Sequence, residues 1–238
     1  MIGPHNIFYL DLIKRFNAEV VPFDGLKNQG RQLCIRHDVD HDIEKALQIA
    51  DFERNHGISS TYFLLHTAKY FQDNKLLRKS CDRLTRLGHS IGFHNNALTE
   101  WFLHSRPISF TVNNALNVLR YNGHQIDFTA SHGSREGREL GFCNFEIWKE
   151  CKKKKVLNNP QVSLKDVNLE EVYFMPFNFY LSESGSKWRG GIPNGSGYWF
   201  ERDFPFLKRQ EIYDQVDAFA HTKSAAAQLL THPKWWSL

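Results

Sequence analysis

The sequence predicts an α/β fold in which parallel strands are joined by helices, and three observations support this. Short apolar runs alternate with amphipathic stretches through much of the chain. The 238 residues, 41% of them hydrophobic, suffice for one large core and fall in the size range of single-domain α/β barrels. Aspartate and histidine residues follow several of the apolar runs. We therefore expect one domain, residues 1–238, with these polar side chains gathered at one mouth.

The expected strands are short apolar runs bounded by turn residues or by helices. In chain order they are 32–36, 60–65, 90–93, 126–130, 171–174, 178–181 and 225–230, the last being either a strand or a helix turning into one. Residues 162–206 are rich in Gly, Asn, Ser and aromatic side chains, so we expect mainly loops there, placed over a site.

The expected helices carry apolar residues at helical spacing. They are 42–56, 73–87, 108–121 and 145–151. Gly57 and Gly88 follow the first two and are typical of the residue at which a helix stops. Asp42 precedes the first and is expected to cap it.

Composition excludes several classes of protein. The net charge is only +4, and we interpret the basic run Lys152–Lys155 as solvated surface, so no nucleic-acid partner is expected. The four cysteines form no CxxC pair, which favours reduced thiols in a cytoplasmic protein. The N-terminus does not resemble a signal peptide, and no apolar run approaches the roughly 20 residues of a membrane span.

Asp38 and Asp40 are the most informative polar pair. Side chains two residues apart on an extended chain share a face, about 6.5 Å apart, so the two carboxylates are expected to point the same way. Two buried like charges repel unless a cation or a proton lies between them. A metal bound by one carboxylate, with the other free to accept a proton from water, resolves this. The alternative is that both only cap the following helix.

Three histidines also follow apolar runs and are expected at the same mouth: His94, His132 and His232. Each alone fits a structural, hydrogen-bonded role as well as a ligand, and their joint occurrence favours chemistry. Gly92 allows a close backbone approach beside His94. His37 is expected to point away from Asp38.

Four segments of the chain resemble the polysaccharide deacetylases, or NodB-like carbohydrate esterases. They are Arg36-His37-Asp38-Val39-Asp40, residues 57–64, residues 88–94 and residues 229–235. The resemblance implies a distorted (β/α) barrel of the NodB type. It also implies a metal-dependent hydrolase that removes an N-acetyl group from an amino sugar, in surface-polysaccharide or glycan-precursor biosynthesis.

The resemblance also implies roles for individual residues. Asp40 and His94 would bind a divalent metal, Asp38 would be the general base and His232 the general acid. In better-known members a second metal histidine lies four residues after the first, where this chain has Leu98. We propose His132 as the third ligand instead, since one carboxylate and two imidazoles suit zinc or a similar ion.

The family's Arg-x-Pro motif is absent, because Met175-Pro-Phe has no arginine, so the sequence does not identify the residue that orients the base. An inactive carbohydrate-binding relative, or a hydrolase of a non-sugar amide or ureide, remains an alternative. Five residues are expected near the carbohydrate: Glu183, Trp188, Arg189, Leu230 and Trp235. A plain surface loop explains the first three equally well, and core packing explains Leu230. The sequence does not indicate an oligomeric state.

Overall fold

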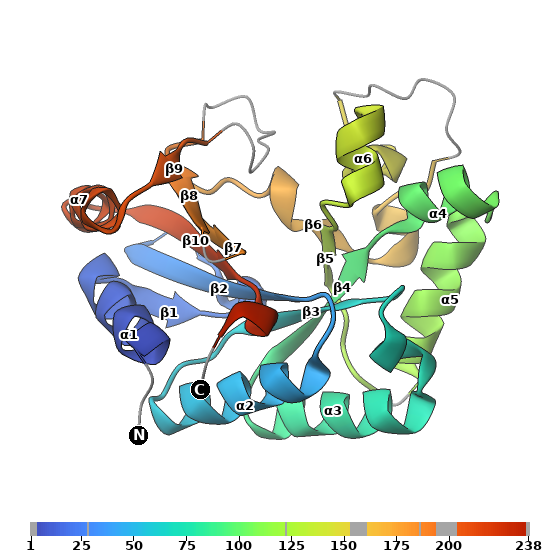
Figure 1. The fold of residues 1–238 in the computed structure, drawn as a ribbon, viewed down its shortest axis with the longest axis horizontal. Coiled ribbons are helices and arrows are strands. Elements are labelled where there is room, and N and C mark those ends of the chain that lie inside the picture. The colour runs from blue at the N-terminus through green and yellow to red at the C-terminus, as the bar shows by residue number, and fades with distance from the viewer. Residues whose placement is uncertain are drawn as a thin grey trace. The chain divides into compact units, whose positions relative to one another are not determined.

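The computed structural model describes residues 4–27, 29–121, 123–152, 161–185, 187–193 and 204–236. The chain forms two compact units. The first contains residues 1–62, 83–90 and 176–238, and the second contains residues 63–82 and 91–175. The helices and strands of both are labelled in Figure 1. The expectation of a single domain stays a prediction.

The sheet of the first unit is mainly parallel. Its neighbouring strands are, in order, β1 (Glu19–Val21), β2 (Arg31–Val39), β10 (Ala225–Thr231), β7 (Phe179–Ser184), β8 (Lys187–Gly191) and β9 (Phe206–Leu207). The first four run parallel, whereas β8 and β9 are added antiparallel. Because β2 and β10 lie side by side, the residues at their carboxyl ends lie close together although they are far apart in the sequence (Figure 1).

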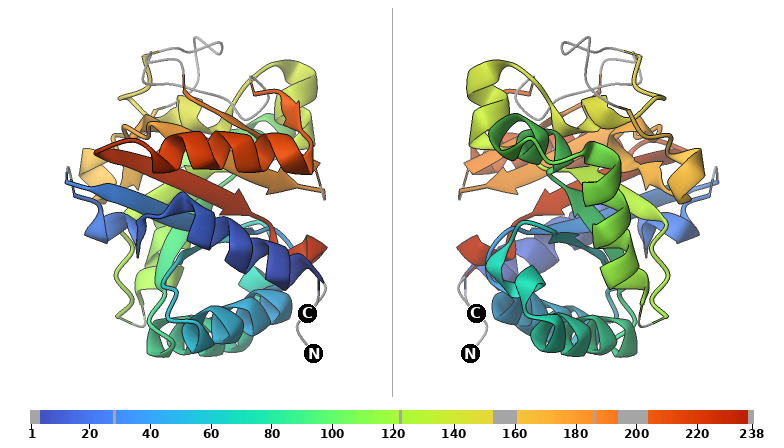
Figure 2. Two further views of the ribbon diagram at one scale, coloured as in Figure 1. Left: turned by 90° about the vertical axis from the view of Figure 1, so that its left-hand side faces the viewer. Right: turned by 90° about the vertical axis from the view of Figure 1, so that its right-hand side faces the viewer.

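Helices α1 (Pro4–Phe16) and α7 (Arg209–Ala220) cover one face of this sheet, and Figure 2 shows both beside β2 and β10. The core residues alternate along each strand, as the period of an extended chain requires. The buried set from these elements is Tyr9, Leu12, Phe16, Leu33, Ile35, Phe179, Leu181, Ile212, Val216, Phe219, Ala225, Ala227 and Leu229. The intervening residues of β2, including Arg36 and Asp38, therefore face the opposite side.

Helix α2 (Ile43–Asn55) fixes the turn that follows Asp40. The Asp42 carboxylate accepts a hydrogen bond from the backbone N–H of Lys45 at 3.1 Å, which confirms the predicted cap. Gly57 follows the helix with φ of 70°, a conformation that costs glycine little. Strand β3 (Thr61–Leu65) and helix α3 (Asn74–Arg86) come next in the chain.

The second unit contains the parallel strands β4 (Ser90–Asn95), β5 (Phe128–Ser131) and β6 (Glu170–Glu171). Its helices include α4 (Ala97–His104), α5 (Ile108–Arg120) and α6 (Arg135–Leu140). Gly92 of β4 lies against the ring of Phe63, with which a Cβ atom would collide. The predicted reason for a glycine before His94 is thus confirmed.

The predicted α/β class with a parallel sheet is confirmed, with seven α-helices in the described residues. Closure of the sheet into a barrel stays a prediction. Residues 225–230, left open between strand and helix, belong to strand β10. Within the described residues, no helix has the length and hydropathy needed to cross a bilayer.

Some predicted elements are wrong. Residues 145–151 do not form an α-helix: a 3₁₀ turn, Asn144–Ile147, is followed by a bridge between Trp148 and Val162. The strand predicted at 171–174 ends at Glu171. The buried Glu171 carboxylate accepts a hydrogen bond from the Trp148 indole N–H. Helices α1, α4, α6 and α7 were not predicted, and neither were strands β1, β8 and β9. Of the basic run, Lys152 is exposed, and residues 153–155 lie outside the described residues.

Candidate active site

A buried ion pair between Arg36 and Asp38 lies on β2. The two residues are two positions apart on the strand, so they share a face. Arg36 Nε donates to Asp38 Oδ1 and Arg36 Nη2 donates to Oδ2, each at 2.6 Å. The exposed fractions of the two side chains are 0% and 4%. The guanidinium thus fixes the carboxylate plane and compensates its charge in a site with little water.

Arg36 is therefore the residue that orients the predicted base, which the sequence analysis did not identify. The signal was present in the sequence, because Arg36 precedes Asp38 by the same two-residue spacing that places Asp38 and Asp40 on one face. The resemblance had directed the expectation to an arginine in a distant Arg-x-Pro motif, which is absent from this chain. A guanidinium two residues away on the same strand can supply the same fork of hydrogen-bond donors.

His232 follows β10 and lies near Asp40. Its Nδ1 is 2.6 Å from the backbone carbonyl oxygen of Glu183, and only a protonated Nδ1 can donate to that acceptor. The tautomer is thereby fixed, and Nε2 is the ring nitrogen that can exchange a proton with a substrate. This Nε2 is 4.0 Å from Oδ2 of Asp40, and both side chains are partly exposed. The structure thus brings together two predicted site residues of the first unit, Asp40 and His232, and Asp38 precedes Asp40 by two residues at the end of β2.

The residue between Arg36 and Asp38 has a different environment. His37 Nε2 is 2.9 Å from Glu53 Oε1, and its Nδ1 is 2.7 Å from the Thr231 hydroxyl. Glu53 also accepts hydrogen bonds from the hydroxyls of Tyr9, Tyr62 and Ser60. His37 and Glu53 are fully buried. His37 thus points away from the Asp38 side, as predicted.

In the second unit, His94 and His132 form an imidazole pair. His94 Nδ1 donates to the Ala130 carbonyl at 2.7 Å, so its Nε2 is the nitrogen that can bind a ligand. This Nε2 is 3.2 Å from His132 Nδ1, and the rings are almost perpendicular, at 85°. The backbone N–H of His132 donates to the carbonyl of Asn95 at 2.8 Å, which holds the residue at the end of β5 beside β4. The two histidines predicted as metal ligands therefore converge.

The Leu98 position, where a second metal histidine would be expected, is part of the core. Leu98 lies in the first turn of α4 and is fully buried. Its backbone N–H, like that of Thr99, donates to the side-chain carbonyl of Asn144. Asn144 also donates to the backbone carbonyl of His132 at 2.9 Å. One buried amide thus joins the start of α4 to the loop that carries His132.

His66 lies beside this pair and was not predicted. Its Nε2 accepts a hydrogen bond from the backbone N–H of Asn96 at 2.9 Å. Burial, followed by the electrostatic effects of His94, His132 and Arg106, lowers the pKa of His66 to about 3. His66 is therefore neutral at physiological pH and carries its proton on Nδ1. Its position after the apolar strand β3 was a signal of the kind that identified the other histidines.

The residues predicted to bind the substrate differ in their surroundings. Glu183 is buried, Leu230 is buried on the face that also carries Arg36, and Trp235 is 43% exposed. Trp188 is half-buried and makes an edge contact with Phe8 on the core side of the sheet. Arg189 is on the opposite side of β8 from Trp188. Their roles toward a substrate stay predictions.

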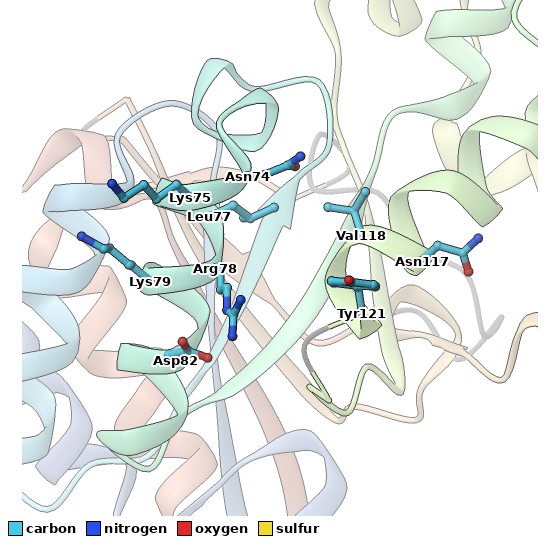
Figure 3. Close-up of a pocket in the computed structure, with 9 residues that line it drawn as sticks. All are labelled: Asn74, Lys75, Leu77, Arg78, Lys79, Asp82, Asn117, Val118 and Tyr121. Carbon is cyan, nitrogen blue, oxygen red and sulfur yellow. The ribbon is translucent and has the colours of Figure 1, made fainter.

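A separate hollow of about 640 Å³ lies in the second unit between α3 and α5 (Figure 3). Leu77 and Val118 point toward each other across it. The other residues that line it are Asn74, Lys75, Arg78, Lys79, Asp82, Asn117 and Tyr121. It contains none of the predicted site residues, so we do not place the active site there.

The sequence matches no protein-family model and no curated protein. Among solved structures, the peptidoglycan deacetylase PdaC from Bacillus subtilis matches with 12% identity and a TM-score of 0.44, over 85% of this chain and 76% of that one. A CE4 esterase from Streptococcus mutans matches with 13% identity and a TM-score of 0.44, over 94% of this chain and 78% of that one. A family 4 carbohydrate esterase from Bacillus anthracis matches with 14% identity and a TM-score of 0.34, over 54% of this chain and 59% of that one.

Proposed function

We propose that this chain is a metal-dependent N-deacetylase of the polysaccharide deacetylase superfamily, which hydrolyses the acetamide of an amino sugar in polysaccharide or glycan-precursor biosynthesis. The observation that carries the proposal is the imidazole pair, in which His94 Nε2 and His132 Nδ1 are 3.2 Å apart. Two nitrogen ligands of a tetrahedral zinc ion, each at about 2.0–2.1 Å, are about 3.3–3.4 Å from each other. The spacing and donor type of the pair therefore fit a metal.

We propose that Asp40 completes the ligand set with His94 and His132. Asp40, His94 and His132 offer one carboxylate oxygen and two imidazole nitrogens, a set typical of zinc and similar ions in catalytic sites. The Ala130 carbonyl that accepts a hydrogen bond from His94 Nδ1 supports His94 as a ligand, because metal-bound histidines commonly donate their second N–H to such an acceptor. When bound, a divalent metal supplies positive charge that polarises the acyl carbonyl and acidifies the attacking water.

Asp38 is the general base in this proposal. Arg36 binds one carboxylate oxygen with each of two N–H groups, which fixes the direction in which either oxygen can accept a proton from water. The ion pair also favours the ionised carboxylate, the form that a base requires. Arg36 acts through Asp38 and is therefore a positioning residue.

His232 is the general acid. Its Nδ1–H is held by the Glu183 carbonyl, so the transferable proton is on Nε2. The amine released by amide hydrolysis is a poor leaving group until it is protonated, and Nε2 would deliver that proton. Asp40 Oδ2, 4.0 Å from Nε2, places negative charge near the imidazolium. The proton taken up at Asp38 and the proton released at His232 balance over one turnover.

The test is to measure the metal content of the purified protein together with acetate release from N-acetylated sugars. We expect one divalent ion per chain, loss of acetate release after chelation, and recovery when zinc is restored. Release that survives complete removal of metal would contradict metal dependence. Activity confined to non-sugar amides would support the second enzyme class instead, and a protein with neither metal nor turnover would be an inactive relative.

A further inference from the structure

We propose that the amino-sugar substrate carries an anionic group and that Arg189 and Lys187 bind it. The proposal rests on the deacetylase function above and adds the charge class of the substrate. It starts from a row of register partners across the sheet of the first unit. Arg36 pairs with Leu230, Leu230 with Ser182, Ser182 with Arg189 and Arg189 with Phe206.

Directly paired residues of neighbouring strands present their side chains on the same face of a sheet. The face that holds the Arg36–Asp38 ion pair therefore continues across β10 and β7 to Arg189 and Phe206 on β8 and β9, which Figure 1 shows at the edge of this sheet. Three strand spacings of about 4.8 Å separate β2 from β8, or about 14 Å along the sheet. An amino sugar extended by a second sugar or by a diphosphate spans such a distance.

Arg189 is held in place on this face. Its guanidinium carbon is 3.5 Å from the centroid of the Phe206 ring, and its Nη1 donates to the Phe204 carbonyl at 2.7 Å. The Phe206 side chain is 58% exposed, so the stacked pair is open to solvent on one side. A guanidinium fixed by a ring face and one carbonyl keeps further N–H donors for a ligand and loses little side-chain entropy on binding.

Lys187 adds a second positive charge on the same side. It is two residues from Arg189 on β8 and pairs with Ser184, toward the end of the sheet at which Asp38 lies. Its ammonium is 5.6 Å from the centroid of the Phe206 ring. Within the part of the chain that the structure describes, neither Arg189 nor Lys187 has a carboxylate partner. Two cations around one aromatic ring, without acidic partners, suit a phosphate or a carboxylate on the substrate.

The experiment compares ligands that share the non-reducing N-acetylated sugar and differ in the group at the reducing end, which is neutral or anionic. The neutral probe is N,N′-diacetylchitobiose, and the charged probes are its 1-phosphate and the corresponding aldonic acid, which carries a carboxylate. Binding is measured by calorimetry on the Asp38→Asn protein, so that turnover is not required. We expect at least one charged probe to bind about tenfold or more tightly than the neutral one, and the tighter of the two identifies the anion. High salt should weaken only the charged probes.

The double variant Lys187→Gln, Arg189→Gln should bring the ratio of charged to neutral affinity close to one. Lys223→Gln, the same substitution at an exposed lysine before β10, should leave the ratio unchanged. Lys187→Gln alone changes only an exposed side chain and should reduce the ratio in a protein that folds normally. Equal affinity for charged and neutral probes, or a ratio unaffected by the double variant, would overturn the proposal.

The two proposals fail separately. If acetate is released but the charged probes have no advantage, the anion site is wrong and the deacetylase function stands. If no sugar is deacetylated but charged probes bind through Arg189 and Lys187, the anion site stands and the deacetylase function is wrong.

Discussion

Strand β2 contributes to two buried polar pairs on its opposite faces, the hydrogen-bonded pair His37–Glu53 and the ion pair Arg36–Asp38, and they differ in what surrounds them. His37 and Glu53 lie on the core side, where three hydroxyl groups also donate hydrogen bonds to the Glu53 carboxylate. Arg36 and Asp38 lie on the other face, and the partly exposed Asp40 and His232 follow the carboxyl ends of β2 and β10. His37 and Glu53 are fully buried, so no solute can reach them. Asp40 and His232, by contrast, are partly exposed, so a substrate can reach them. The difference indicates that the first pair stabilises the fold, and it supports the proposal that Asp38 of the second pair acts as a general base.

Replacing the predicted base should produce the largest effect. Asp38→Asn keeps the shape of the side chain but removes the group that accepts the proton, so kcat/KM for acetate release should fall about 10²- to 10⁴-fold. Metal content should be unchanged, because Asp40, His94 and His132 are the proposed ligands. Asp42→Asn is the matched control, since asparagine also caps a helix. Full activity in Asp38→Asn would remove its assigned role.

Replacing Glu53 of the fully buried His37–Glu53 pair should reduce stability and not activity alone. Glu53→Gln removes the negative charge at the centre of the His37, Tyr9, Tyr62 and Ser60 network, and we expect the free energy of unfolding to fall by about 3–5 kcal/mol. Urea unfolding measures this change. Glu44→Gln, at an exposed position of the same helix, should change it by less than about 0.5 kcal/mol. A loss as small in Glu53→Gln as in the control would show that the network contributes little.

Arg36→Lys tests whether the base needs a fork of donors or only a positive charge. Lysine keeps the charge but cannot donate to both carboxylate oxygens in one plane, so we expect kcat to fall about tenfold or more with little change in KM. The pH dependence of kcat should shift as well, because the environment of the Asp38 carboxylate changes. An unchanged kcat and pH profile would mean that charge alone is enough.

The smallest effect concerns pH. Burial alone would raise the pKa of Glu53, but the charge and hydrogen bond of His37, with His89 and Ser60, lower it to about 2 from the usual 4.5. Because the folded pKa is the lower one, the stability from ionised Glu53 is fully present above about pH 4.5 and is lost as the pH falls toward 2. The stability gap between the wild-type protein and Glu53→Gln should therefore narrow below about pH 4.5, by at most about 1.4 kcal/mol per pH unit. A gap that stays constant from about pH 5 to about pH 3 would contradict this linkage.

Much of the site could be predicted because its residues follow strands. Asp38, Asp40, His94, His132 and His232 were identified from their positions after apolar runs, since the carboxyl ends of parallel strands lie at one edge of a sheet. The structure brings His94 and His132 together, and it places Asp40 near His232. His66 follows the same pattern, directly after the apolar run of β3, but was not included among the expected site residues.

By itself, the sequence determined the local features of this protein: the alternation of strands and helices, the cap at Asp42, the glycine that allows β4 to pass Phe63, and the opposite directions of His37 and Asp38. These depend on backbone periods and on residues close in the chain. Only the tertiary structure decided that Glu53 is the partner of His37. It also decided that Arg189 lies in register with Arg36, because strand order and helix packing bring together residues more than 150 positions apart.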